Sequence, residues 1–318
     1  VVADVVVADP ARRLPPPKPT PVRPPRVLTD SWDIPADGFS PMLRRERFFS
    51  ETLGRHVAYL IYLPPDYDSA VDRRYPVMYF LVGVSGDARK VGTLPDKLDQ
   101  RIRDGRLPPM ILVVPQGVLA SFYTDSFDGQ RPVETVLANE LVPHIDRAYR
   151  TLATASSRSV EGHSMGGFGA AYLAFRHPRL FSAVSICSAP LAPRSFFARD
   201  CPSILADVWG SEPGYFRQRD PWNLAELNAD VLRDSVRVRL LVGRKDRFRV
   251  CVEDMHERLR HLGIAVGLRV LEGAGHDHWQ LVEQAGEDYW SFWRDAFVPP
   301  ATSAKSAQPL VLVDQPVR

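Results

Sequence analysis

Cysteine, net charge and long hydrophobic runs are all scarce in this sequence, and each scarcity excludes a class of protein. The three cysteines, Cys187, Cys201 and Cys251, have no paired metal-type spacing, and their odd number argues against a complete disulfide framework. The 40 Lys and Arg against 38 Asp and Glu leave a net charge of +2, too little for an electrostatic grip on nucleic acid. Apolar runs such as residues 110–114 fall far short of the roughly 18 residues of a membrane span. We therefore expect a soluble chain with no nucleic-acid partner and no membrane span.

The pattern of a secretory signal, a basic region followed by a long apolar stretch, is also missing from the N-terminus. This predicts a cytoplasmic protein, with a secreted protein as the alternative if a signal has been removed. Eight prolines fall within residues 10–26, a composition that favours extended chain and cannot build a core. We predict a flexible proline-rich arm over residues 1–29, a folded catalytic domain over 30–297 and a C-terminal tail over 298–318.

Between the two tails, strand-like and helix-like segments alternate. Short runs rich in apolar and β-branched residues predict strands at 44–50, 55–63, 76–82, 110–115, 159–163, 183–187, 237–242 and 267–272. Helical patterns occupy 96–106, 133–149, 165–176, 250–262 and 278–297. The first two strands read as an antiparallel hairpin, and the later short apolar runs are typical of buried parallel strands. The order predicts a three-layer α/β domain with a mostly parallel central sheet.

The segment Gly162-His163-Ser164-Met165-Gly166 lies between a predicted strand and a helix rich in Ala and Gly. This is the G-x-S-x-G nucleophile elbow in the context that it requires, strand then sharp turn then helix. Glycine is needed there because strand and helix pass very close to each other. The motif predicts an α/β-hydrolase fold with Ser164 as the nucleophile.

Serine needs a histidine to take its proton, and in this fold the partners follow in the order Ser, acid, His. His276 follows the last predicted strand in a Gly-rich loop and is the predicted general base, with His278 in reserve. His177 ends a helix, and His256 and His261 lie in a charged helix, so we expect solvent or capping roles for these three.

The acid is expected at the end of the preceding strand, where Asp246 stands. Basic neighbours leave open the alternative that Asp246 belongs to a surface ion pair. Glu253 and Asp254, in the following helix, are the substitutes.

The oxyanion hole requires two backbone N–H donors, one after the nucleophile and one in the loop after the third strand. Met165 supplies the first. Val84 is predicted to supply the second, with Ser85 as the alternative.

Several ordered motifs also carry a family resemblance. They are Gly54-Arg55, residues 62–67 (YLPPDY), 75–77 (YPV), 121–125 (SFYTD), 140–146 (ELVPHID), the elbow, and 275–277 (GHD). Over about residues 45–297 the chain resembles the putative-esterase family, which includes feruloyl esterases, S-formylglutathione hydrolases, enterochelin esterases and mycolyltransferases. The resemblance implies the same three residues, Ser164, Asp246 and His276. The sequence departs from the family in the loop after the third strand, residues 82–87, which we call the oxyanion loop. Val82 stands there where a histidine is usual before the glycine.

Aromatic and acidic residues near the predicted site supply candidates for substrate binding. Tyr123 and Asp125 belong to the segment expected beside the nucleophile, where they either contact substrate or brace the loop. Residues 190–234 lie between two core strands and are predicted to form a small cap. Trp209 and Trp222, within it, are predicted to contact an aryl or acyl group or to pack the cap.

These residues predict a serine hydrolase that cleaves a small ester or thioester without a metal or organic cofactor. One alternative is an acyltransferase with the same triad, in which an alcohol replaces water. A second alternative, of another class, is a non-catalytic binding protein that kept the fold. The altered oxyanion loop favours this second alternative, and the complete triad argues against it.

Overall fold

The computed structural model describes residues 31–297. The predicted arm over residues 1–29 and the predicted tail over 298–318 lie outside the described residues. The elements below therefore belong to the central segment, for which the sequence predicts the folded domain.

Eight strands form one sheet with the spatial order β1-β2-β4-β3-β5-β6-β7-β8. Their bounds are β1 (Arg44–Ser50), β2 (Arg55–Tyr62), β3 (Val77–Leu81), β4 (Ile111–Pro115), β5 (Arg158–His163), β6 (Ala183–Cys187), β7 (Arg237–Gly243) and β8 (Val266–Leu271). The pairs β1–β2 and β2–β4 are antiparallel, and all other neighbouring strands are parallel. The predicted mostly parallel sheet with an N-terminal hairpin is confirmed.

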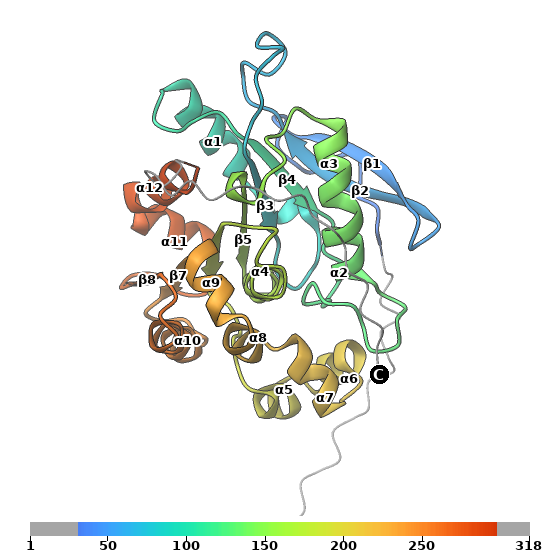
Figure 1. Cartoon of the computed structure of the whole chain (residues 1–318), viewed down its shortest axis with the longest axis vertical. Helices are drawn as coiled ribbons and strands as arrows, with labels where there is room; N and C mark the ends of the chain where they lie inside the picture. Colours follow the sequence, from blue (N-terminus) through green and yellow to red (C-terminus); the bar gives the residue numbers. More distant parts are fainter. Residues whose placement is uncertain (1–30, 298–318) are drawn as a thin grey trace, which may run out of the picture.

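Helices cover both faces of the central sheet (Figure 1), and alternate residues of the central strands belong to two different hydrophobic clusters. On β3, Tyr79 belongs to one hydrophobic cluster, whereas Met78 and Phe80 belong to the other. The first layer includes α3 (Val142–Ala148), α4 (Met165–Arg176) and α10 (Arg249–His261); the second includes α1 (Leu94–Arg103), α11 (His278–Ala285) and α12 (Glu287–Ala296). Because both faces are covered, β3 and β4 consist of apolar and aromatic residues alone. Within residues 31–297, no helix has the length and hydrophobicity to cross a membrane.

Two of the predicted helices are divided in the structure. The helix expected over 133–149 consists of α2 (Val133–Thr135), a π-helical segment (Val136–Leu141) and α3. The single closing helix predicted over 278–297 is wrong, because Gly286 adopts φ +55° and separates α11 from α12. A positive φ is readily adopted only by glycine, and it ends the first helix there.

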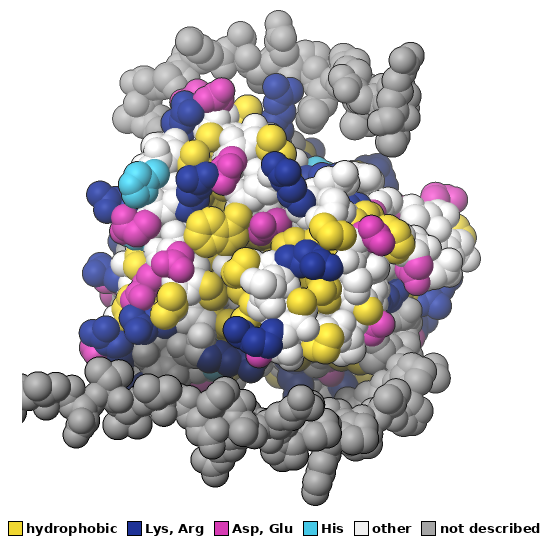
Figure 2. Space-filling model, turned by 90° about the horizontal axis from the view of Figure 1, so that it is seen from below, with side chains coloured by type: hydrophobic (Ala, Val, Ile, Leu, Met, Phe, Trp, Pro, Cys, Tyr) yellow, Lys and Arg dark blue, Asp and Glu magenta, His cyan; other side chains and the backbone are white. Residues whose placement is uncertain are grey.

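The segment predicted to form a cap, residues 190–234, is helical. It contains α5 (Arg194–Asp200), α6 (Pro202–Trp209), α7 (Pro213–Arg219), α8 (Pro221–Leu227) and most of α9 (Ala229–Ser235). Three of these helices begin with proline, whose fixed φ suits the first helical position. Helices α5 to α8 lie together at one end of the molecule, beyond the sheet (Figure 1). Seen from this end, the surface carries hydrophobic side chains among charges of both signs (Figure 2).

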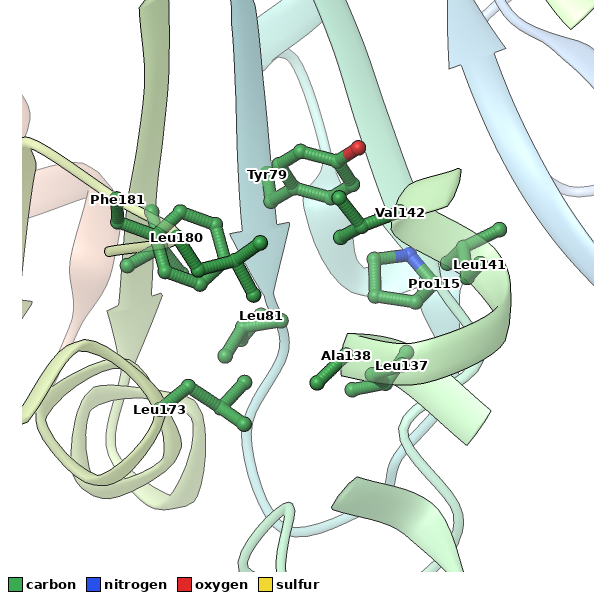
Figure 3. A pocket seen from close by; sticks show the side chains of 11 residues that line it. Tyr79, Leu81, Pro115, Leu137, Ala138, Leu141, Val142, Leu173, Leu180 and Phe181 are labelled. Carbon is green, nitrogen blue, oxygen red and sulfur yellow. The ribbon is translucent and has the colours of Figure 1, made fainter. Parts of the chain in front are cut away.

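A small apolar cavity lies between the sheet, α4 and the π-helical segment (Figure 3). Its volume of about 10 Å³ is no larger than the space for one water molecule. Leu81 of β3, Leu173 of α4 and Ala138 of the π-helical segment are among its lining residues, and none of Ser164, Asp246 or His276 is. The cavity is therefore a packing defect of the core.

Candidate active site

The nucleophile elbow is a sharp turn between β5 and α4. Ser164 has φ +58° and ψ −121°, a conformation that is strained for any residue other than glycine. Its N–H donates to the Cys187 carbonyl oxygen at 2.9 Å, which ties the turn to the end of β6. A Cβ atom on Gly166 would lie 1.9 Å from the Leu81 carbonyl oxygen, so glycine is what allows α4 to approach β3. Strand, turn and helix thus hold Ser164 at the first turn of α4.

The three side chains predicted for catalysis form one continuous chain of hydrogen bonds. His276 Nε2 lies 2.9 Å from Ser164 Oγ, and His276 Nδ1 lies 2.9 Å from Asp246 Oδ2. An ionised carboxylate can only accept, so Nδ1 carries the proton of the neutral ring and Nε2 accepts the Ser164 hydroxyl. Residues that are 112 and 30 positions apart in sequence are thereby brought together in the order that nucleophilic catalysis requires.

Asp246 is held in its ionised form by the groups around it. Its side chain is fully buried, and the Phe248 N–H donates to Oδ1 at 2.8 Å. Burial alone would raise the pKa of Asp246, but the hydrogen bonds from His276 and from the Phe248 N–H outweigh burial and lower it. The carboxylate can therefore stabilise positive charge on His276.

Two rings that the sequence analysis did not identify flank the His276 imidazole. The His163 ring lies 4.8 Å from it and the Phe248 ring lies 5.2 Å from it, measured between centroids. Burial, followed by the imidazoles of His278 and His276, lowers the pKa of His163 to about 3. His163 is thus neutral near pH 7. Its ring packs against the His276 ring without placing a second positive charge beside it. The signal that the sequence offered for these two rings was their position: His163 directly precedes the nucleophile, and Phe248 follows the acid by two residues.

The two predicted oxyanion donors belong to segments that lie next to the nucleophile. Met165 begins α4, where the helix dipole favours negative charge. Val84 is 50% exposed in the loop after β3, and its carbonyl oxygen accepts the Ala120 N–H at 2.9 Å. A Cβ atom on Gly83 would lie 3.7 Å from Ser164 Cβ, so this loop passes directly beside the nucleophile. Among the described residues, neither the Met165 nor the Val84 N–H has an acceptor.

Tyr123 braces the oxyanion loop through its hydroxyl group. Its side chain is fully buried, and its hydroxyl donates to the Val82 carbonyl oxygen at 3.0 Å. A Cβ atom on Gly169 would lie 2.5 Å from the Tyr123 ring, so glycine in α4 makes room for the tyrosine. The structure therefore does not place Tyr123 where a substrate could touch it. Val82, which replaces the usual histidine, is fixed through its backbone.

The other predicted substrate contacts are also engaged within the protein. Asp125 accepts the N–H and the hydroxyl of Thr135, at 3.0 and 2.6 Å, and so braces the last residue of α2. Trp209 is completely buried and packs against Phe122, Phe168, Phe197 and Phe216, which makes it a core residue rather than a wall of the site. Trp222 is half-buried, and its indole N–H donates to the Leu191 carbonyl oxygen at 2.9 Å. Aromatic composition did not reveal which of these rings face inward.

The reserve candidates for base and acid have other partners. His278 Nε2 lies 3.0 Å from Glu161 Oε1. His177 Nε2 lies 2.9 Å from Oε1 of Glu134 in α2. Glu253 pairs with Arg249 one helical turn away. His256, His261 and Asp254 lie on α10, outside the hydrogen-bond chain of Ser164. Of the candidates considered, only His276 and Asp246 connect to the nucleophile.

Comparisons with known proteins find relatives in sequence and in fold. A sequence model of the putative esterase family matches residues 50–302. Esterase Rv1288 of Mycobacterium tuberculosis is 31% identical over 198 residues, which make up 60% of this chain and 42% of that protein. A solved ferulic acid esterase is 26% identical with a TM-score of 0.68, covering 80% of this chain and 98% of its own. An S-formylglutathione hydrolase from Agrobacterium tumefaciens shares the fold, with 20% identity, a TM-score of 0.61 and coverage of 80% and 95%. The chain spans less than half the length of the curated mycobacterial relative.

Proposed function

This chain belongs to the putative esterase family, and we propose on that premise that it is a serine esterase. It cleaves a carboxylic ester or thioester through an acyl-serine intermediate. The observation that supports this proposal is the unbroken hydrogen-bond chain from Ser164 through His276 to Asp246. These groups suffice for acyl transfer, and the proposed steps use no metal and no organic cofactor.

The first step forms the acyl-enzyme. As Ser164 Oγ bonds to the carbonyl carbon, its proton passes to His276 Nε2, and the carbonyl oxygen becomes an oxyanion. We assign the N–H groups of Met165 and Val84 as the donors to this oxyanion, and the N-terminus of α4 adds a favourable dipole. The tetrahedral intermediate then breaks its bond to the alcohol or thiol, which leaves with the proton from His276.

The second step releases the acid. His276 takes a proton from water while the water oxygen attacks the acyl carbon. Breakdown of this intermediate returns the proton to Ser164 Oγ and frees the carboxylic acid. In both steps the buried Asp246 carboxylate offsets the positive charge of the protonated His276.

Aromatic rings beside the base suggest which esters to examine first. Phe248 contacts the His276 ring, and the half-buried Phe196 of α5 lies 6.1 Å from Phe248, measured between ring centroids. Phe248 is itself buried, so the half-buried Phe196 is the ring available to the apolar part of an acyl or aryl group. One similar structure is named a ferulic acid esterase. We therefore propose aryl and short acyl esters, represented by methyl ferulate and p-nitrophenyl acetate, as the first substrates.

The test compares the wild type with Ser164→Ala on these two esters and on a thioester. We expect hydrolysis by the wild type and a loss of at least about 10³-fold in kcat for the variant. Full activity in a folded Ser164→Ala protein would rule out the mechanism. Analysis of products in the presence of an alcohol distinguishes the two acyl acceptors: a hydrolase gives mainly free acid, whereas an acyltransferase gives mainly the new ester.

A further inference from the structure

A buried carboxylate three residues before the nucleophile has no part in the steps above. Glu161 of β5 is completely buried, and its Oε1 accepts hydrogen bonds from His278 Nε2 at 3.0 Å and from the Tyr289 hydroxyl at 2.5 Å. Arg239 of β7 donates to Oε2 at 3.0 Å. Burial would raise the pKa of Glu161, but the interactions with His278, Arg239 and Tyr289 outweigh it and lower the pKa. The carboxylate is thus ionised and fully hydrogen-bonded, and we call these four residues the Glu161 cluster.

The positions of Glu161 and His278 in the chain allow this pair to affect the contact between Ser164 and His276. Glu161 lies three residues before Ser164, on the strand that carries the nucleophile. His278 lies two residues after His276 and begins α11, with an extended residue between the two histidines. Two hydrogen bonds therefore join β5 and the turn after it to the segment around His276: Glu161 to His278 at 3.0 Å and Ser164 to His276 at 2.9 Å. We call residues 272–277, between β8 and α11, the His276 loop.

A cation is a poor occupant of this cluster. Cys187 completes a set of three potential metal ligands with Glu161 and His278, all within 4.8 Å of one another. However, both Glu161 oxygens already accept hydrogen bonds, and one of them pairs with the guanidinium of Arg239. A metal ion would have to face this fixed positive charge and displace those donors. The hydrogen bonds, rather than a metal, define what the cluster does.

We propose that Glu161 and His278 are positioning residues for the general base: their hydrogen bond fixes the His276 loop to the nucleophile strand and so sets the Ser164–His276 distance. This inference rests on the proposed function. The structure assigns His278, which the sequence offered only as a substitute base, to this supporting role. The reason that it affects catalysis is geometric, because a displacement of about 1 Å of a reacting group can cost about 10²-fold in rate.

The molecule contains a matched control. Glu134 of α2 is also buried and accepts hydrogen bonds from His177 at 2.9 Å, from Arg176 at 2.5 Å and from the Tyr172 hydroxyl. This second cluster has the same four residue types as the Glu161 cluster. It joins α2 to the C-terminal end of α4, and none of these hydrogen bonds involves β5 or the segment around His276.

The experiment compares His278→Leu with His177→Leu, and each with its conservative variant, His278→Gln or His177→Gln. Leucine cannot donate a hydrogen bond, whereas the glutamine amide can occupy the place of Nε2 and donate to the carboxylate. We expect both leucine variants to unfold more readily than the wild type. We expect only His278→Leu to lower kcat, by about 10- to 100-fold with little change in KM, and to slow labelling of Ser164 by a fluorophosphonate equally. His278→Gln should recover most of that loss.

Two results would overturn the inference. One is a His278→Leu enzyme with wild-type kcat; the other is an equal fall of kcat in His278→Leu and His177→Leu, which would mean a general loss of structure. If His278→Leu does not fold, His278→Asn replaces it, since the shorter amide stops short of Glu161 and should lower kcat in the same way. Ser164→Ala, measured alongside, separates the two hypotheses: activity without Ser164 rejects the esterase mechanism, whereas Ser164-dependent activity that is unchanged in the His278 variants rejects only the positioning role.

Discussion

Asp246 determines, at the scale of the single residue, which nitrogen of His276 carries a proton. Its buried carboxylate accepts from Nδ1 and thereby leaves Nε2 as the acceptor of the serine proton. An asparagine at this position can offer its amide N–H to Nδ1 instead, which favours the wrong tautomer. The charge and the hydrogen-bond direction of one side chain are thus essential to the proposed chemistry.

We predict that Asp246→Asn lowers kcat by about 10³- to 10⁴-fold while KM changes little. Asp254→Asn, on the exposed face of α10, removes a carboxylate from the next helix and should keep wild-type kinetics. Steady-state kinetics on one ester measures both variants. If Asp246→Asn were as active as Asp254→Asn, Asp246 could not be the partner of the base.

Tyr123 supports the oxyanion loop through one hydroxyl group, and Tyr123→Phe removes that group alone. The change leaves the Val82 carbonyl oxygen without its donor, so we expect a loss of about 1 kcal/mol in the free energy of unfolding and a severalfold fall in kcat. Tyr79→Phe is the matched control, because the buried Tyr79 hydroxyl has no partner among the described residues. Its removal should leave kcat unchanged and stability equal or higher. Thermal unfolding and kinetics on both variants check this, and equal effects of the two would contradict the bracing role.

At the scale of the secondary-structure element, the approach of α4 to the sheet places the nucleophile. Gly162 and Gly166 both sit where a Cβ atom would collide with backbone, at 2.0 Å from the Gly166 carbonyl oxygen and 1.9 Å from the Leu81 carbonyl oxygen respectively. Helix and strands can therefore meet only if these positions have no side chain. The close contact holds the first turn of α4, with Met165, beside Ser164.

We predict that Gly166→Ala destabilises the protein by about 3 kcal/mol or more, or prevents folding, because the new methyl group has no space. Gly214→Ala lies in α7, where an added Cβ atom would have no neighbouring atom within 4 Å, so it should stabilise by up to about 1 kcal/mol through helix propensity. Chemical denaturation of the two variants tests this contrast. A folded, active Gly166→Ala protein would contradict the described packing of α4.

The sequence predicted the bounds of strands and helices correctly where neighbouring residues in the chain determine them. Strands β1 and β6 have their predicted bounds, because turns or polar residues flank a short run of β-forming residues. The elbow and the order Ser, acid, His led to Ser164, Asp246 and His276, three residues that the structure joins by hydrogen bonds. The break at Gly286 was missed, since glycine adopts φ values of either sign readily and the helical pattern on both sides of it does not say which.

Contacts between distant segments were beyond the reach of local patterns. Glu161 and His278 are 117 positions apart, and neither is unusual in its own neighbourhood. The sequence left open whether Trp209 contacts substrate or packs the cap, and the structure buries it among phenylalanines. Which face of a helix points inward depends on the packing of the whole domain, and composition does not determine it.

At the scale of the whole molecule, buried carboxylates make stability depend on pH. Burial would raise the pKa of Glu134, but the hydrogen bond from His177 and the interactions with Arg176 and Tyr172 outweigh burial and lower its pKa to about 2, from an ordinary 4.5. A carboxyl group with a lower pKa in the folded state stabilises that state fully above its unfolded pKa and loses this effect as the pH falls through its folded pKa.

We therefore predict that Glu134 contributes about 3 kcal/mol to the free energy of unfolding near neutral pH, and that this contribution is lost between about pH 4.5 and pH 2. Glu134→Gln should be less stable than the wild type at neutral pH and should lose less stability on acidification. Glu283→Gln, at an exposed carboxylate on α11, serves as the control and should follow the wild-type curve. Urea denaturation across this pH range measures all three proteins. A wild-type acid slope in Glu134→Gln would mean that other groups control acid unfolding.

The most direct measurement of the central claim is to treat the purified protein with an active-site fluorophosphonate and to locate the added mass by peptide mass spectrometry. An activated serine is required for this reaction, and the hydrogen bond from Ser164 to His276 provides one. We predict stoichiometric labelling at Ser164 and none in Ser164→Ala. A well-folded wild type that remains unlabelled, or that is labelled at another residue, would contradict the assignment of Ser164 as the nucleophile.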